Sequence, residues 1–129
     1  MINIFLSILG YDIWFYISHL ILHTKYLYIY HKEHHKNTIN LTFLDTYTGH
    51  ILEGPFQGIG ILLPYVFSLS MTISDFIIVL ILVNIRGMMR HDYRCVWLIG
   101  DHHLLHHQYP KYNYGEFWID YMCNTIKDK

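Results

Sequence analysis

The feature that most constrains this chain is the spacing of its eleven histidines. Nine of them fall into three short groups, HLILH, HKEHH and HHLLHH, and the last two share the spacing HxxHH; His91 stands alone and is counted here with these nine as a grouped histidine. Residues three and four positions apart lie on one face of a helix, so each group predicts a patch of imidazoles. The ten grouped residues are His19, His23, His31, His34, His35, His91, His102, His103, His106 and His107.

Imidazole patches of this kind predict metal binding, because ring nitrogens are good ligands for iron, zinc, copper and nickel. One zinc ion takes only about four ligands, so ten imidazoles favour two ions, with each HxxHH serving one ion or shared between both. The chain has no CxxC pair for a thiolate site, and its three glutamates are too few for a carboxylate-bridged di-iron bundle. We expect nearby acids to orient ring N–H groups, namely Asp12, Glu53, Asp92 and Asp101.

Three apolar stretches predict membrane helices at residues 2–22, 54–69 and 73–85. Crossing a bilayer takes about 20 apolar residues, so the first is long enough and the other two are short. Pro64 is expected to kink the second stretch. A signal peptide and a soluble core hairpin are the competing interpretations. We expect one all-α, integral membrane domain over residues 1–129, with three spans or one span plus a hairpin, and a histidine-rich cytosolic helical cap.

The positions of the Lys and Arg residues predict how the chain is oriented in the membrane. Residues 1–24 and 37–85 contain no Lys or Arg, so all nine cations lie on the side of the membrane that carries the grouped histidines. The positive-inside rule makes that side cytoplasmic. The net charge of -1 and the lack of a cationic run argue against a nucleic-acid partner.

The order of the motifs resembles the fatty acid hydroxylase and sterol desaturase superfamily: HxxxH, then HxxHH, then a second HxxHH after a hydrophobic hairpin. DIWFYISHLILH, NIRGMMRHD and HHLLHHQYPKYNYGEFW are similar to three of its segments, the last to the HHxxHH…NYG signature of lathosterol-oxidase-like members. HILEG resembles its H-P-x-(D/E)-G element without the proline. The closing W-D-x-x-F-G-T here reads IDYMCNT, which places the C-terminal turn in question.

The resemblance implies a membrane-embedded enzyme with two iron ions, or zinc in a purified form, that uses O2 to oxidise a sterol or a fatty acyl chain. Hydroxylation and desaturation both remain open, and the NYG signature inclines toward sterols. Electrons would come from NAD(P)H through its reductase and a carrier such as cytochrome b5, in the endoplasmic reticulum of a eukaryote. Family members have further upstream spans, so a homo-oligomer could complete the bundle. The implied ligands are the grouped histidines, with His102 preferred to His50 as the tenth.

Two alternatives to a lipid oxidoreductase stay open: an enzyme of another reaction class and a protein without catalytic activity. A membrane zinc hydrolase would need a general base, and Glu33 is the one acid inside a histidine group, although HKEHH is not the HExxH arrangement. A non-catalytic metal-binding membrane protein is the other. Consumption of O2 in the presence of a reductant distinguishes the oxidoreductase from both.

Overall fold

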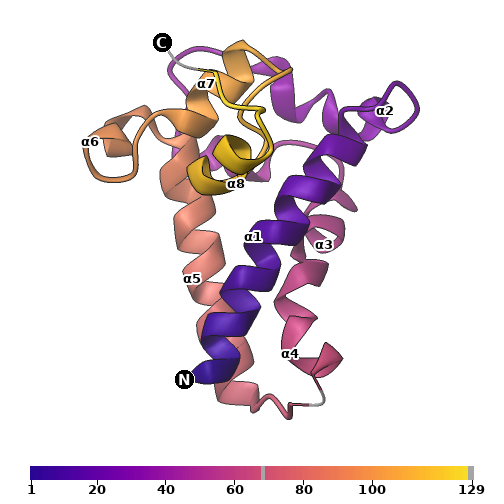
Figure 1. Ribbon diagram of the computed structural model, residues 1–129. Helices are drawn as coiled ribbons and strands as arrows, with labels where there is room; N and C mark the ends of the chain where they lie inside the picture. The colour runs from indigo at the N-terminus through magenta and orange to yellow at the C-terminus, as the bar shows by residue number, and fades with distance from the viewer. Residues whose placement is uncertain (68, 128–129) are drawn as a thin grey trace.

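The computed structural model describes residues 1–67 and 69–127, and every regular element within them is helical, which confirms the all-α prediction (Figure 1). Two long helices, α1 (Ile2–Leu22) and α5 (Ile73–His91), pack side by side. The N-terminus and residues 69–72, which precede α5, lie at one end of this pair. The short helices that carry most of the histidines form a cap at the other end.

Helix α1 matches the first apolar stretch, which contains no proline and a single glycine. Among the described residues it is the one helix with both the length and the apolar composition of a membrane span. Its buried face carries Asp12, Tyr16 and His19 in one stripe, because residues three and four positions apart share a face of a helix. The helix therefore brings its first histidine to the cap while its other faces stay apolar.

The second apolar stretch is broken, so the single kinked span predicted there was wrong. It forms α3 (Glu53–Gly58), a 3-10 turn η3 (Ile59–Leu62) and α4 (Leu63–Val66). Pro64 lies in the first turn of α4, where its missing N–H leaves no hydrogen bond unmade, so it begins a helix instead of kinking one. The break follows from close packing, because η3 lies directly against α1.

Helix α5 begins after Thr72, whose hydroxyl accepts a hydrogen bond from the Asp75 N–H at 3.0 Å, and it runs six residues beyond the predicted end of the third stretch. The extra turns bring Arg90 and His91 into the cap. Arg90 is buried and pairs with Glu116, which holds its guanidinium inside the protein.

A second arginine of α5, Arg86, interacts with the carboxylates of Asp12 and Glu116. Arg86 pairs with Asp12, and its guanidinium lies 3.5 Å from Glu116. The expected role of Asp12 in orienting a histidine is therefore not what the structure shows, because its carboxylate joins α1 to α5.

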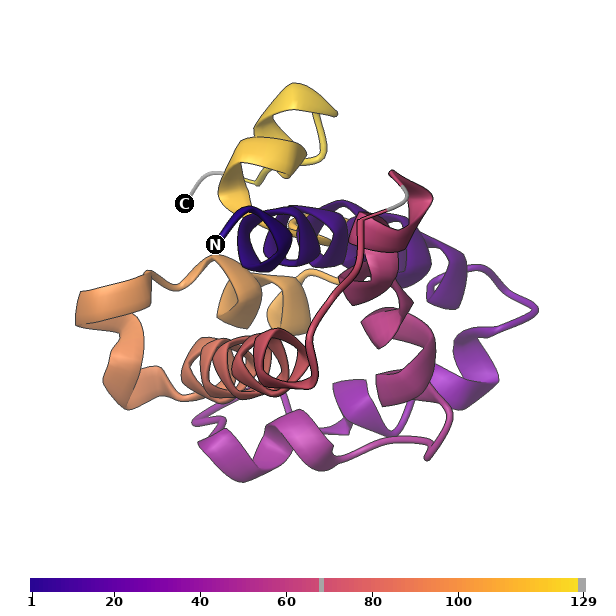
Figure 2. The same ribbon diagram turned by 90° about the horizontal axis from the view of Figure 1, so that it is seen from below.

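The cap consists of short helices around the end of α5. Seen from below, α1 lies between α8 and α5 (Figure 2). Tyr16, Tyr114 and Ile119 form a small apolar core that fastens α8 to α1. The remaining elements are α2 (Tyr28–His31), η1 (His34–Lys36), η2 (Phe43–Tyr47), η4 (Tyr93–Cys95), α6 (Val96–Ile99), α7 (His102–Gln108) and α8 (Phe117–Met122).

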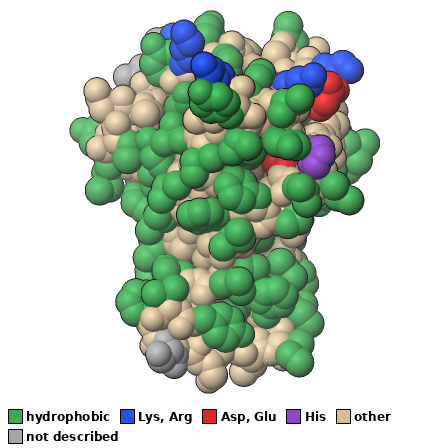
Figure 3. Space-filling model, turned by 90° about the vertical axis from the view of Figure 1, so that its right-hand side faces the viewer, with side chains coloured by type: hydrophobic (Ala, Val, Ile, Leu, Met, Phe, Trp, Pro, Cys, Tyr) green, Lys and Arg blue, Asp and Glu red, His purple; other side chains and the backbone are tan. Residues whose placement is uncertain are grey.

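Hydrophobic side chains cover much of the narrower body on the face shown in Figure 3, whereas Lys and Arg gather at the cap end. Along α5, Ile77, Ile81 and Ile85 are each about half exposed. Soluble proteins rarely expose apolar surface over so long a helix. On this face the surface therefore separates into an apolar body and a cap end that carries the Lys and Arg side chains.

Candidate metal centre

Nine of the ten grouped histidines meet in two clusters inside the cap, and within each cluster the ligand nitrogens lie within 4.8 Å of one another. Every one of these side chains is buried except His23, which is partly buried. The first cluster, called here the five-histidine cluster, contains His19, His23, His31, His35 and His106. The second, the four-histidine cluster, contains His34, His91, His103 and His107.

Each HxxHH group divides between the clusters, which is the shared arrangement that the spacing left open. In the first group the two residues four positions apart, His31 and His35, go to one cluster and the intervening His34 to the other. In the second group His103 and His107 go to the four-histidine cluster, and the intervening His106 goes to the five-histidine cluster. At about 100° per residue, offsets of three and four point to opposite sides of the starting residue, so one helical turn can serve two sites.

Backbone carbonyls fix the rings. Five of the nine imidazoles have Nδ1 within hydrogen-bond distance of a carbonyl oxygen, to which an Nδ1–H would donate. This contact selects the tautomer whose Nε2 carries a lone pair. The carbonyls are those of Tyr114, Thr48, Gly87, Tyr112 and Asn37, which contact His19, His34, His91, His106 and His107 respectively.

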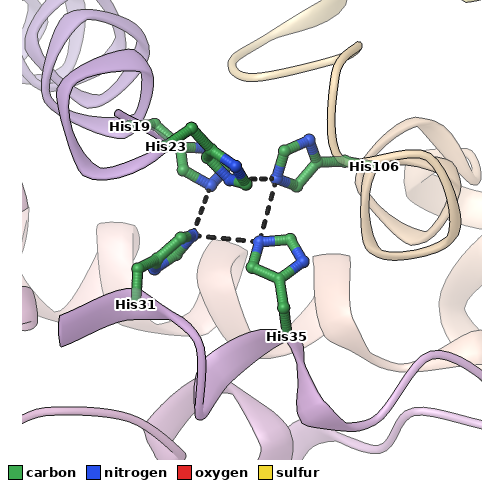
Figure 4. A group of neighbouring side chains, drawn as sticks. All are labelled: His19, His23, His31, His35 and His106. Carbon is green, nitrogen blue, oxygen red and sulfur yellow. Dashed lines mark hydrogen bonds between the residues drawn. The ribbon is translucent and has the colours of Figure 1, made fainter. Parts of the chain in front are cut away.

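The Nε2 atoms of the five-histidine cluster point at one another (Figure 4). Their separations are 2.9 Å for His19–His31, 3.0 Å for His31–His35 and His23–His106, and 3.1 Å for His35–His106. Where both rings hold their proton on Nδ1, such a contact joins two lone pairs and is repulsive unless a cation lies between them. Nitrogens bound to one ion at about 2.1 Å also lie about 3 Å from their neighbours in octahedral geometry.

The four-histidine cluster repeats this geometry. Nε2 of His91 lies 2.9 Å from that of His34 and 3.0 Å from that of His103, and both His34 and His91 have Nδ1 next to a carbonyl. Nε2 of His107 is buried with no hydrogen-bond partner among the described residues. The donor set and the convergent lone pairs therefore fit two metal ions, one for each cluster.

Burial keeps the cap imidazoles neutral. Desolvation lowers the pKa of His31 to about 4 and that of His107 to about 3, and it lowers the pKa of His35 further below the ordinary histidine value. Neighbouring histidines add to the effect for His35 and His107, because protonated rings would repel one another. Near pH 7 these rings are in the unprotonated form that a metal ion requires.

Of the acids expected to contact the histidines, Glu53 does so. Its buried Oε1 lies 2.9 Å from Nδ1 of His31 and 3.9 Å from Nδ1 of His34, so one carboxyl group reaches both clusters. Burial raises the pKa of Glu53 to about 7. Asp92 instead binds the Arg94 guanidinium at 2.6 and 2.8 Å, and Asp101 precedes α7 as its N-cap residue.

His102 is not brought to either cluster, and neither is His50. Nε2 of His102 contacts Asp120, which the sequence analysis did not single out as a site residue. Asp120 is fully buried and also accepts hydrogen bonds from the N–H groups of Tyr114 and Gly115 and from the Thr125 hydroxyl, at 2.7 to 2.9 Å. It thereby fixes the segment whose carbonyl at Tyr114 contacts His19. The sequence did contain a signal for Asp120, because IDYMCNT keeps the Asp and the Thr of the family's closing motif.

Asparagines occupy the special backbone positions of this C-terminal segment. Asn113 has a positive φ of 58°. A Cβ on Gly115 would lie 2.9 Å from the Cβ of Tyr16, so this glycine is needed for close approach to α1. Asn124 stands where the family motif has glycine and has a φ of 55°, a left-handed conformation that asparagine tolerates. The changed motif therefore keeps its turn.

We expect Asp120→Asn to destabilise the protein by about 1–3 kcal/mol, because the new amide NH2 would face buried donors and leave one unsatisfied. Chemical unfolding of the purified protein in detergent measures the change. The control is Glu33→Gln, an exposed substitution expected to alter stability by no more than about 0.5 kcal/mol. Equal stability of the two variants would contradict the role given to Asp120.

Residues 4–125 match the family model for fatty acid hydroxylases, which covers nearly the whole chain and confirms the resemblance seen in the motifs. No curated protein and no solved structure matches the chain. All nine clustered histidines lie inside the matched region.

Proposed function

The chain belongs to the fatty acid hydroxylase family, and from this premise we propose that it is a membrane-bound, O2-dependent lipid oxidoreductase. It would hydroxylate or desaturate a sterol or a fatty acyl substrate. The observation that carries the proposal is the pair of buried clusters, in which nine imidazoles present their ligand nitrogens to two adjacent sites. A hydrolase with one catalytic zinc ion needs only about three protein ligands, far fewer than these nine imidazoles.

The clustered histidines would hold two iron ions, one in each cluster, and bound iron supplies the electrons and the Lewis acidity for O2 activation and C–H oxidation. The protein's own contribution is orientation. Carbonyls hold the Nδ1 side of five of the rings, Glu53 lies against both clusters, and eight of the nine rings are buried. The imidazoles are neutral, so as ligands they would leave the positive charge of the ions largely uncompensated.

We place the apolar body in the membrane and the cap on its cytoplasmic side. Helix α1 has the length and composition of a span, and the Lys and Arg residues on the face shown in Figure 3 lie at the cap end. Lipid would reach the clusters from the bilayer, and an electron carrier such as cytochrome b5, reduced by NAD(P)H through its reductase, would approach the cap from the cytosol. A homo-oligomer would cover part of the apolar surface.

The test is oxidation of lipid by the purified, iron-loaded protein in phosphatidylcholine nanodiscs, with reduced cytochrome b5 as the electron donor. We expect O2 consumption together with a hydroxylated or desaturated lipid product, detected by mass spectrometry. His103→Ala, which leaves three rings in the four-histidine cluster, is expected to abolish both signals. Hydrolysed lipid in the presence of zinc, or no oxidised product with full iron loading, would overturn the proposal.

A further inference from the structure

Two short helices of the cap, α6 and α8, expose large apolar and aromatic side chains. On α6, Trp97 is 83% exposed and Leu98 is 59% exposed. Side chains of this size normally pack against a neighbour, so their exposure on two helices marks a surface that contacts something else. The set, called here the belt, consists of Trp97, Leu98, Phe117, Trp118, Tyr121 and Met122.

The belt carries no charge. Asp120 is the one charged residue within α6 and α8, and its side chain is fully buried. The charged residues that precede the two helices are paired. Arg94, before α6, pairs with Asp92. Glu116, before α8, pairs with Arg90. The exposed faces of both helices are therefore apolar and aromatic, and they suit a partner that offers no countercharge.

Both helices lie at the level where the apolar body meets the cap. Helix α1 has 21 residues and α5 has 19, so at about 1.5 Å per residue each is about 30 Å long, which is the thickness of the hydrocarbon core of a bilayer. Helix α6 begins at Val96, shortly after α5 ends at His91. Helix α8 packs through Ile119 against Tyr16, in the half of α1 nearer the cap. With the body across the hydrocarbon, both helices lie at its cytoplasmic boundary.

We propose that α6 and α8 lie in the headgroup region of the cytoplasmic leaflet, with the belt in contact with phospholipid, so that the cap rests on the bilayer. The proposal rests on the membrane placement in the proposed function. Trp and Tyr are enriched at this depth of membrane proteins, because their amphipathic rings suit the boundary between headgroups and hydrocarbon. Since the belt has no charge, neutral phosphatidylcholine is a sufficient partner.

The arrangement of the two helices favours a bilayer over a partner protein. Seen from below, α6 lies beyond α5, whereas α8 lies on the side of α1 that faces away from α5 (Figure 2). The belt is thus divided between different sides of the helix pair. One partner protein would cover one of these sides. A bilayer surrounds the body and contacts both sides at the same level.

The test is fluorescence quenching of single tryptophans, since the chain contains only Trp14, Trp97 and Trp118. Three double variants, each with two tryptophans replaced by phenylalanine, leave one emitter each. Each variant is loaded with zinc and placed in phosphatidylcholine nanodiscs whose acyl chains carry bromine atoms near either the glycerol end or the methyl end. Iodide in the buffer serves as the quencher from the water side.

We expect bromine near the glycerol end to lower the emission of Trp97 and of Trp118 about twofold or more, because both rings lie at the boundary of the hydrocarbon. Bromine near the methyl end, and iodide, should have smaller effects. Trp14 is the control for depth, since it lies near the middle of α1 beside exposed Ile13 and Ile17. Its emission should respond most to bromine near the methyl end.

A second measurement retains all three tryptophans. Met122→Cys carries a nitroxide label in a chain whose native thiols are removed by Cys95→Ser and Cys123→Ser. The control is Lys36→Cys in the same background, because the Lys36 side chain is 78% exposed and charged. We expect the label at position 122 to collide more with O2, which concentrates in lipid, and the label at position 36 to collide more with a soluble nickel chelate. Metal content measured on every variant shows whether the clusters are folded.

The outcomes separate the three possible surroundings of the belt. Quenching of Trp97 or Trp118 by iodide and not by lipid bromine would place the belt in water and overturn the proposal. Protection from both quenchers would show that protein, such as a second copy of the chain, covers the belt, which also overturns it. If lipid is oxidised while the belt lies in water, the oxidoreductase stands without this contact. If the belt contacts lipid and the iron-loaded protein oxidises none, the contact stands and the proposed reaction fails.

Discussion

Replacing His103 with alanine is expected to remove about one of two bound metal ions from each chain, whereas His23→Ala should leave the metal content nearly unchanged. The reason is the unequal size of the clusters. Loss of His103 reduces the four-histidine cluster to three rings, whereas loss of His23 still leaves four rings in its cluster. His23 is also the one clustered ring that is only partly buried, so its loss disturbs the packing least.

Metal analysis of detergent-purified protein after dialysis measures this difference. The control is His50→Ala, because His50 is exposed and lies outside both clusters. We expect this variant to retain the full metal content. Equal loss from all three variants would show that metal binds nonspecifically to the histidine-rich chain, and full retention in His103→Ala would remove the four-histidine cluster as a metal site.

The sequence was sufficient to predict which histidines gather but not how they divide. Grouping depends on local spacing, which is readable from HxxHH, and nine of the ten selected rings do meet. Assignment to a cluster depends on where α1, α5 and α7 place their ends relative to one another. His102 shows the same limit: it precedes His103 by one residue and is therefore turned about 100° away on the helix, toward Asp120.

The apolar stretches were predictable in extent but not in continuity. Length and hydropathy predicted α1 well because a long apolar run without proline has few alternatives to a helix. The break in the second stretch depends on a contact between residues fifty positions apart, Gly10 and Gly60. Such a contact has no local signal beyond the glycines themselves, which sequence alone does not distinguish from glycines in open positions such as Gly58.

Gly60→Ala is expected to destabilise the fold by about 1–3 kcal/mol, the usual cost of forcing extra volume into a packed interface. A Cβ at this position would overlap the carbonyl oxygen of Gly10 and lie 2.6 Å from the Cβ of Trp14, so α1 and η3 would have to separate. Separation would also strain the hydrogen bond that Trp14 Nε1 donates to the Phe56 carbonyl at 2.7 Å.

Gly58→Ala is the matched control, since it adds the same methyl group two residues earlier, at the end of α3, where a Cβ would meet nothing within 4 Å. We expect it to be neutral or to stabilise by up to about 1 kcal/mol, because alanine loses less backbone entropy than glycine. Chemical unfolding in detergent compares the two. If Gly60→Ala were as stable as Gly58→Ala, η3 would not be held against α1 by this contact.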